Sequence, residues 1–217
     1  MIPLKRRYML IVMILLSGLI IACDAQDRPT ISFYLATQRG DLDQFERHLH
    51  WQAGINQSFP DGRYPLHVVA EQGKISLLEA LLAHQAVLTV RDAAGRTPVE
   101  SAILHGHIQA AEVLLNAGAA INASGLLLRA AQQGSQDRDV VRFLIRQGAD
   151  PEVADAAGNT PLLIAIQQHN HRLVAHLLAQ GADVDARNVQ GQSALSLAQQ
   201  QQLETIQHSL RRYGASE

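Results

Sequence analysis

Apolar residues recur along the chain at intervals of three and four residues, the spacing that places side chains on one face of a helix. Leu77–Leu78 is followed by Leu81–Leu82 in this way. A shorter apolar segment, Leu66–Ala70, precedes that stretch, and Gly73 separates the two. Because glycine favours the left-handed conformation that ends helices, the pattern predicts pairs of short helices. Strands would instead alternate apolar and polar residues.

This helix-pair pattern repeats along the chain. Six alanines mark the repeat, and the step from one to the next is the same throughout, apart from one shorter step between Ala119 and Ala149. They are Ala53, Ala86, Ala119, Ala149, Ala182 and Ala215. A second series, which includes Pro65 and Pro98, begins with the same step. The common step of about 33 residues indicates units that stack side by side and share one core. We place units near residues 30, 63, 96, 124, 159 and 192.

The starts of the helices are marked as well. Thr97–Pro98 and Thr160–Pro161 stand where a first helix would begin, since threonine caps free N–H groups and proline has none to leave unpaired. Together with the period and Tyr64–His67, these residues resemble the ankyrin repeat, whose first helix opens on Thr-Pro-Leu-His. The resemblance covers about residues 30–215. It implies an all-α solenoid of about six helix-turn-helix repeats with short hairpin loops.

Two intervals depart from the period. The step from Pro98 to Leu126 is shorter than the others, which shortens the hairpin loop before the fourth repeat. The next step, from Leu126 to Pro161, is longer, which lengthens the turn around Ser135–Asp139. The short loop is explained by neutral variation or by a notch that admits one element of a partner. The polar stretches Asp43–His48 and Gln199–Gln202 predict that the first and last repeats are caps of a complete array.

The first residues have the pattern of an export signal. Lys5–Arg7 is basic, Tyr8–Ile21 is almost entirely apolar, and the small residue Ala22 precedes Cys23. The apolar stretch is shorter than the ~20 residues that a membrane-spanning helix needs. Ile20–Cys23 resembles the lipobox of bacterial lipoproteins. That resemblance implies cleavage before Cys23 and lipidation of this cysteine, with palmitate among its acyl chains.

The lipobox resemblance divides the chain into a signal peptide (1–22), a lipidated N-terminus with a short linker (23–29) and the repeat domain (30–217). Two or more acyl chains hold a protein stably on a membrane. Asp24 follows the cysteine, and in enterobacterial lipoproteins this residue marks retention at the inner membrane. The implied location is the bacterial cell envelope, with the repeats facing the periplasm from the inner membrane. An ordinary signal peptide, or an uncleaved anchor, is the alternative.

Composition narrows the function classes. The 18 Lys and Arg and 20 Asp and Glu give a net charge of −2, and the segment before Cys23 includes basic residues but no acidic ones. The remaining body is mildly acidic, which argues against nucleic acid as a partner. Aromatic residues make up only 4%, and alanine and leucine dominate instead, as suits closely stacked helices. The single cysteine forms no internal disulfide.

The sequence lacks the signatures of catalysis and cofactor binding. It has no Gly-x-Ser-x-Gly, no phosphate-binding glycine loop, no dinucleotide fingerprint and no His-Glu-x-x-His. The ten histidines include the close pairs His105 with His107 and His169 with His171. Ankyrin repeats commonly carry histidine where His107 stands, and His67 occupies their Thr-Pro-Leu-His position. We therefore expect no enzyme activity, no cofactor, no metal site and no small-molecule substrate.

The ankyrin resemblance also implies a protein-binding face. Ankyrin proteins bind partners on a concave face lined by the hairpin loops, or fingers, and by the ends of the first helices. The residues at these positions are Ser58, Asp61, Arg63, Glu71, Gln72, Arg91, Arg96, Leu104, His105, Gln132, Gln133, Asn159, Gln167, Gln168, Arg187, Gln190 and Gln192. Because arginine is frequent in interface hot spots, we predict that Arg63, Arg91 and Arg96 meet an acidic patch on the partner.

Three hypotheses describe the partner. Small ankyrin lipoproteins of this layout resemble immunity proteins, which neutralise toxins that neighbouring bacteria deliver into the periplasm. Phospholipase effectors of type VI secretion are one such class of toxin. The alternative is a periplasmic adaptor or scaffold in stress response, because other periplasmic ankyrin proteins accompany catalase. The third hypothesis, an enzyme, has no supporting residues.

Overall fold

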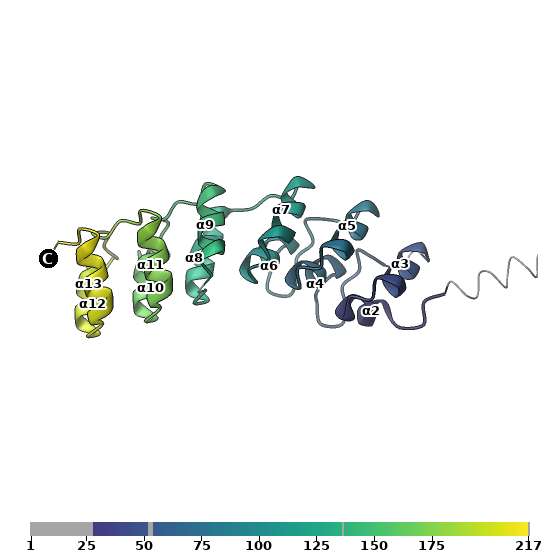
Figure 1. Ribbon diagram of the computed structural model, residues 1–217, viewed down its shortest axis with the longest axis horizontal. Coiled ribbons are helices and arrows are strands. Elements are labelled where there is room, and N and C mark those ends of the chain that lie inside the picture. Colours follow the sequence, from purple (N-terminus) through teal and green to yellow (C-terminus); the bar gives the residue numbers. More distant parts are fainter. Residues whose placement is uncertain (1–27, 52–53, 136, 217) are drawn as a thin grey trace, which may run out of the picture.

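The structure is a computed structural model that describes residues 28–51, 54–135 and 137–216. Within these residues the regular elements are all helices, apart from one isolated bridge between Arg187 and Ser193. The helices are α2 (Phe33–Arg39), α3 (Leu42–His50), α4 (Pro65–Glu71), α5 (Ile75–Ala83), α6 (Pro98–Leu104), α7 (Ile108–Asn116), α8 (Ala123–Gln132), α9 (Arg138–Arg146), α10 (Pro161–Gln167), α11 (His171–Ala179), α12 (Ala194–Gln200) and α13 (Glu204–Arg212). They form six antiparallel pairs in one elongated row (Figure 1). The all-α repeat fold expected from the sequence is confirmed.

We call the first helix of each pair inner and the second outer. Inner helices of neighbouring pairs approach one another more closely than the outer helices do in most of the array. The row therefore bends with its inner helices on the inside. Fingers connect one pair to the next; they are residues 51–64, 84–97, 117–122, 147–160 and 180–193.

The predicted signal peptide, Cys23 and Asp24 lie outside the described residues. Among the helices that are described, none combines the length and the apolar character that crossing a bilayer requires.

Predicted caps fix the starts of several inner helices. The Thr97 hydroxyl accepts from the N–H of Glu100, whose carboxylate accepts in turn from the Thr97 N–H, a complete capping box. Thr160 caps α10 by accepting from the N–H of Leu163. Tyr64 makes no capping hydrogen bond, since its hydroxyl sits at the far end of a ring. Ser193 forms a second capping box, with Ser196, that was not predicted from the sequence.

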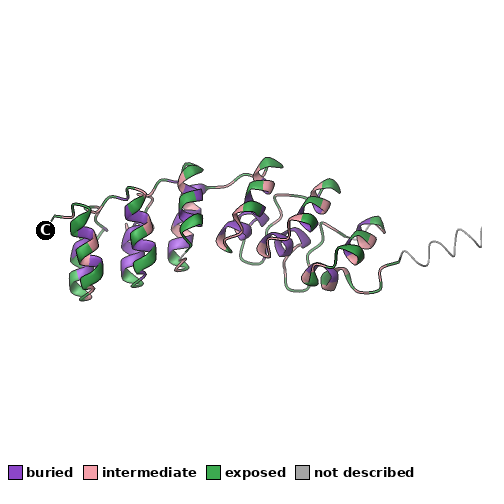
Figure 2. Cartoon of the chain, viewed as in Figure 1, coloured by how far each residue is buried: buried purple, intermediate pink, exposed green. Residues whose placement is uncertain are grey.

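One hydrophobic core runs the length of the row (Figure 2). Inner helices are buried almost all round: every residue of 65–70 and of 161–166 is buried. Outer helices bury one face, as Leu77, Leu78 and Leu81 of α5 do. Each pair thus covers its neighbour, and no single pair encloses its own apolar residues.

The end repeats are polar on their outer helices, as predicted. Helix α3 buries only Phe45 and Leu49, and α13 buries only Ile206 and Leu210. In contrast, α9 in the middle of the row buries Val140, Val141, Phe143 and Leu144.

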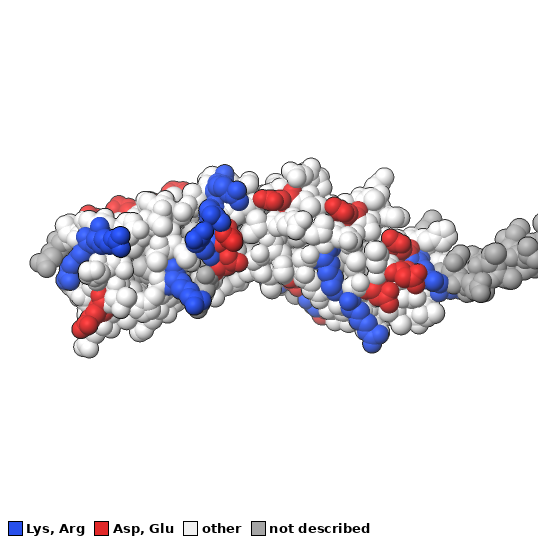
Figure 3. Space-filling view, in the orientation of Figure 1, with Lys and Arg blue, Asp and Glu red and all other residues white. Residues whose placement is uncertain are grey.

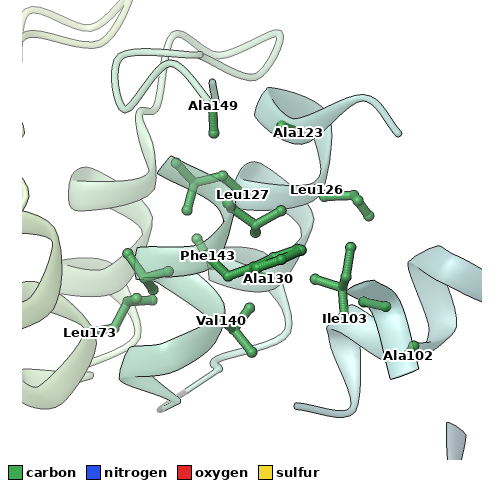
Figure 4. Close-up of a cluster of buried hydrophobic side chains, with 14 of the residues drawn as sticks. Ala102, Ile103, Ala123, Leu126, Leu127, Ala130, Val140, Phe143, Ala149 and Leu173 are labelled. Atoms are coloured by element: carbon green, nitrogen blue, oxygen red, sulfur yellow. The ribbon is translucent and has the colours of Figure 1, made fainter. Parts of the chain in front are cut away.

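The third and fourth pairs meet differently from the others. Residues 117–122 replace a full finger, and α8 begins early, so that it has ten residues where α6 has seven. The turn inside the fourth pair, residues 133–137, is longer than the corresponding residues 105–107. Both departures predicted from the spacing are confirmed. Figure 4 shows Leu126 of α8 directed toward Ile103 of α6 across this junction.

Candidate protein-binding surface

The fingers and the C-terminal ends of the inner helices carry the polar positions predicted from the sequence, and we call these segments together the inner surface. The seventeen positions expected from the sequence all lie on these segments, and none of them is fully buried. The inner helices α4, α6, α8 and α10 end on the expected pairs at 71–72, 104–105, 132–133 and 167–168. The structure therefore brings the predicted residues together on one side of the row.

A recurring side chain shapes each full finger after the first. One carboxylate oxygen of Asp92 accepts from the N–H groups of Ala94 and Arg96, at 2.9 and 2.8 Å. Asp155 and Asn188 close their fingers through the same two hydrogen bonds. These three residues were not expected from the sequence. The signal was present, because each stands four residues before a predicted contact position.

Hydrogen bonds keep the finger aspartates ionised. Burial by itself would raise the pKa of Asp92, but hydrogen bonds from the backbone and side chain of Arg96 outweigh it, and the pKa lies below its ordinary value. For Asp155 the backbone N–H of Asn159 is the largest influence, and it likewise lowers the pKa. The turns therefore hold fixed negative charges beneath the inner surface.

The second and third repeats carry a network of ion pairs. The Glu71 carboxylate, with its side chain only 8% exposed, accepts from Arg63 Nη1 at 2.7 Å and from Arg96 Nη2 at 3.2 Å. Arg63 also pairs with Asp61 at 2.8 Å, and Arg96 with Asp92 at 2.7 Å. The hydrogen bond to Asp61 is the main cause that raises the pKa of Arg63 above its ordinary value. Glu71 thus joins two neighbouring fingers.

This network leaves fewer arginines available to pair with a partner. Arg63, Arg91 and Arg96 do lie along one surface, but Arg63 and Arg96 are already ion-paired within the chain. Arg91 is exposed and donates to the Gly95 carbonyl at 2.6 Å, a neutral acceptor. An acidic patch on a partner would therefore meet Arg91 with the least competition.

The fifth and sixth repeats carry amides where the second and third carry charges. Asn159 Oδ1 accepts from Gln167 Nε2 and from Asn188 Nδ2, both at 3.1 Å. Gln192 Oε1 accepts from Asn188 at 3.0 Å, and Gln192 Nε2 donates to Gln200 at 3.4 Å. Gln200 was not expected from the sequence. These amides offer hydrogen-bond donors and acceptors that carry no charge themselves.

The remaining predicted residues support the helix ends or stand at the finger tips. Gln168 donates to the Gln132 carbonyl at 2.9 Å, and Gln72 donates to Gln38 at 3.2 Å, so both link neighbouring repeats. Ser58, Gln133, Arg187 and Gln190 are exposed. Beside Gln190, the Val189 side chain is 74% exposed. This apolar finger tip was not predicted, since an isolated valine in a loop carries no periodic signal.

Several of the described histidines lie within hydrogen-bonding distance of backbone carbonyls. His67 is fully buried, and its Nε2 lies 2.8 Å from the Arg96 carbonyl of the next finger. Burial lowers the pKa of His67 below its ordinary value, so this residue is a neutral donor to that carbonyl. His105 Nδ1 lies 2.8 Å from the Ser101 carbonyl of its own helix. No group of three or more His, Cys, Asp and Glu in the described part of the chain is arranged to hold a metal ion.

Comparison with known proteins agrees with this geometry. A family model described as ankyrin repeats (3 copies) matches residues 33–124 and 127–215, and its two matches divide at the start of α8. Rabankyrin-5 of Mus musculus is 34% identical over 159 residues, which cover 70% of this chain and 13% of that protein. A putative ankyrin repeat-containing protein of Treponema pallidum is 31% identical over 108 residues, 47% of this chain and 36% of the relative. The chain thus spans a minor part of each relative's length.

A solved structure shows the same fold. The ankyrin repeat domain of Bcl-3, titled a unique member of the IkappaB protein family, superposes with a TM-score of 0.70 at 24% sequence identity. The superposition covers 87% of this chain and 88% of that domain.

Proposed function

The chain belongs to the ankyrin-repeat family, and on that premise we propose that it captures one partner protein on its inner surface while tethered to a membrane outside the cytoplasm. The ankyrin fold is typically a non-enzymatic interaction scaffold, and no catalytic family is indicated. The observation that carries the proposal is the inner surface itself. Its polar side chains stand on fingers whose turns are closed by Asp92, Asp155 and Asn188.

A surface fixed before binding loses little conformational entropy when a partner arrives. Glu71 ties two fingers together, and the amide chain through Asn188 does the same for the last two fingers. The two networks differ in chemistry, with ion pairs around Glu71 and amides around Asn188. A partner that matches both presents an acidic group to Arg91 and uncharged polar groups to Gln167 and Gln200.

We infer that the partner is a toxin delivered into the periplasm, so that binding neutralises it. The support is the export pattern of residues 1–23 and the resemblance to immunity lipoproteins. A tethered binder stays beside the membrane, where a phospholipase toxin acts. The alternative is a stress-response scaffold, for instance one associated with catalase. Such a scaffold would use the same surface to bind a protein that resides in the envelope.

Capture from the envelope of the native host separates these roles. The full chain, tagged at its C-terminus and cross-linked in living cells, is expected to recover a secreted effector as the main partner. Recovery of a resident envelope complex instead would reject the immunity role and leave the scaffold.

A matched pair of variants tests the surface. Leu104→Glu with Gln132→Glu adds two charges to the inner surface, and Ser76→Glu with Ala83→Glu adds two charges to exposed positions of the outer helix α5. We expect the inner pair to reduce capture of the partner at least tenfold and the outer pair to leave it unchanged. Equal effects would show that the partner does not use the inner surface.

The tether has its own test. Cells supplied with labelled palmitate are expected to label the wild-type chain but not Cys23→Ser, and the variant should be released from the membrane fraction. Label on the Cys23→Ser variant would show that Cys23 is not the lipidated residue.

A further inference from the structure

The charges on the outer helices are divided between the two halves of the row. Helices α3, α5 and α7 carry four acidic residues and one arginine; these are Asp43, Glu46, Glu79, Glu112 and Arg47. Helices α9, α11 and α13 carry six arginines and two acidic residues; these are Arg138, Arg142, Arg146, Arg172, Arg211, Arg212, Asp139 and Glu204. The outer side therefore changes from acidic to basic along the row, although the chain as a whole is nearly neutral.

The basic residues lie on three adjacent helices. Arg138, Arg142 and Arg146 follow one another at intervals of four residues on α9, so they share a helix face, and all three are exposed. Basic side chains gather over α9 in Figure 3, with acidic ones beside them. Helix α11 packs between α9 and α13, and its Arg172 is exposed, as are Arg211 and Arg212. We call these six arginines the outer basic surface.

The acidic residues of this half lie mostly elsewhere. Five belong to the fingers: Asp150, Glu152, Asp155, Asp183 and Asp185. Asp137 is the exposed N-cap of α9 and lies close to Arg142 and Arg146. On the outer basic surface itself, Asp139 pairs with Arg142, and the Arg146 guanidinium lies 5.9 Å from the centre of the Phe143 ring. The excess of positive charge therefore faces away from the inner surface.

The surface lacks the anchors that a protein partner uses. Protein interfaces centre on buried aromatic and large apolar side chains within a polar rim. The exposed positions of α9, α11 and α13 are charged, small or polar. Among the described residues the large apolar side chains that are exposed include only Tyr213 beside this surface, at the end of α13. Tyrosine is enriched where proteins meet the boundary between water and lipid.

We propose that the outer basic surface lies on anionic lipid headgroups. Exposed arginines near a negatively charged leaflet are attracted over about a Debye length, without any requirement for a fitted pocket. Docking of the outer helices leaves the inner surface turned toward the solvent, open to a partner. This proposal does not depend on the identity of that partner or on lipidation of Cys23.

Vesicle flotation tests the proposal. Every residue of the hydrophobic core lies between Ala36 and Leu210, so a chain that begins at Asp24 keeps the whole core and lacks the apolar segment that would bind vesicles unaided. Its apparent affinity for vesicles with about one third phosphatidylglycerol is expected to exceed that for pure phosphatidylcholine at least tenfold at low salt, and to fall as salt is raised.

Two double variants with the same change of charge compare the outer basic surface with the fingers. Arg142→Glu with Arg146→Glu reverses the outer basic surface, and Arg91→Glu with Arg187→Glu reverses two exposed finger arginines. The outer pair should lose at least tenfold of its affinity for the anionic vesicles, while the finger pair stays within twofold. Arg211→Glu with Arg212→Glu, at the end of the last helix, should act as the outer pair does. Circular dichroism confirms that each variant is folded.

Equal binding to both kinds of vesicle, or equal loss in the outer and finger pairs, would overturn the proposal. Binding to polyglutamate without binding to anionic vesicles would overturn it as well, in favour of an acidic protein. Capture of the partner protein is a separate readout. The finger pair can reduce it while lipid binding is intact, so failure of one proposal is distinguishable from failure of the other.

Discussion

The junction between the second and third repeats differs from the junction between the third and fourth. At the former, His67 reaches the Arg96 carbonyl at 2.8 Å, and Arg96 pairs with Glu71 at 3.2 Å. At the latter, no hydrogen bond joins the helix pair α6–α7 to the pair α8–α9 among the described residues, and one ion pair, Glu100 with Arg129, crosses at 3.9 Å.

The missing finger explains this difference. A full finger carries backbone groups that the neighbouring finger can bind, as the Val189 N–H donates to the Ala157 carbonyl. Residues 117–122 are too short to do so. A pocket of about 380 Å³ opens on the outer side of the junction, between the starts of α7 and α9, and is lined by Gly106, Ile108, Asp137 and Arg142 among others. Apolar packing of the inner helices is left to hold the two halves together.

The stability of a repeat array is approximately a sum of repeat and interface contributions. A junction held mainly by apolar contacts, with one long ion pair, is therefore the place where we expect the array to divide. Four changes to the chain or its solvent test this contrast, beginning with the largest expected effect.

Leu126→Ala removes the side chain that α8 directs toward Ile103 at the third junction. Leu126 is 2% exposed, and truncating a buried leucine costs about 2–5 kcal/mol. We expect urea unfolding, followed by circular dichroism, to separate into two transitions. Leu162→Ala, at a similarly buried position of α10, should lower stability while the array continues to unfold in one step. A single transition in both variants would contradict a weak third junction.

Glu71→Ala removes the acceptor that joins two fingers at the second junction. Hydrogen bonds to charged groups contribute roughly 1.5–3 kcal/mol each, and part of this is recovered because Arg63 and Arg96 keep their aspartates. We expect a loss of about 1–2 kcal/mol in the free energy of unfolding. Glu71→Gln should lose less, since it keeps an acceptor; a larger loss for glutamine than for alanine would refute the bridging role.

Acid should weaken the second junction more than the third. The pKa of Asp92 in the folded chain lies below its ordinary value of 3.8, so ionised Asp92 stabilises the fold above that pH. The contribution is lost as pH falls below 3.8 and through the lowered folded pKa. Asp92→Asn should therefore show a shallower fall in unfolding free energy as the solution is acidified through this range. An unchanged slope would exclude this carboxylate as a source of acid sensitivity.

Glu100→Gln tests the one polar contact across the third junction. The pair is long, and the Arg129 side chain is 42% exposed, so solvent screens it and its loss should change the unfolding free energy by less than about 0.5 kcal/mol. The amide keeps an acceptor for the Thr97 cap. A loss comparable to that of Glu71→Ala would mean that the third junction is tied by charge after all.

Much of the fold was predictable because its signals are local. Thr97 and Thr160 cap helices that begin at the prolines beside them, and the regular spacing of the alanines correctly indicated six helix pairs. The shortened finger was visible as the short step from Pro98 to Leu126. The inner-surface positions followed from the ankyrin resemblance, because equivalent residues of stacked repeats face the same side.

Partners across repeats were not predictable in this way. Arg96 and Glu71 are separated by 25 residues, and nothing in their order shows that Glu71 faces two arginines at once. Val189 was also missed, since a single exposed valine in a loop carries no periodicity.

The sequence by itself determined the units: their number, their length, where each helix starts and which faces are apolar, because caps and hydrophobic spacing act within one repeat. Tertiary structure alone decided how units meet. Stacking brings residues of neighbouring repeats together, so it paired Glu71 with Arg96, left the third junction with a single long ion pair besides apolar contacts, and placed the arginines of α9, α11 and α13 on adjacent helices.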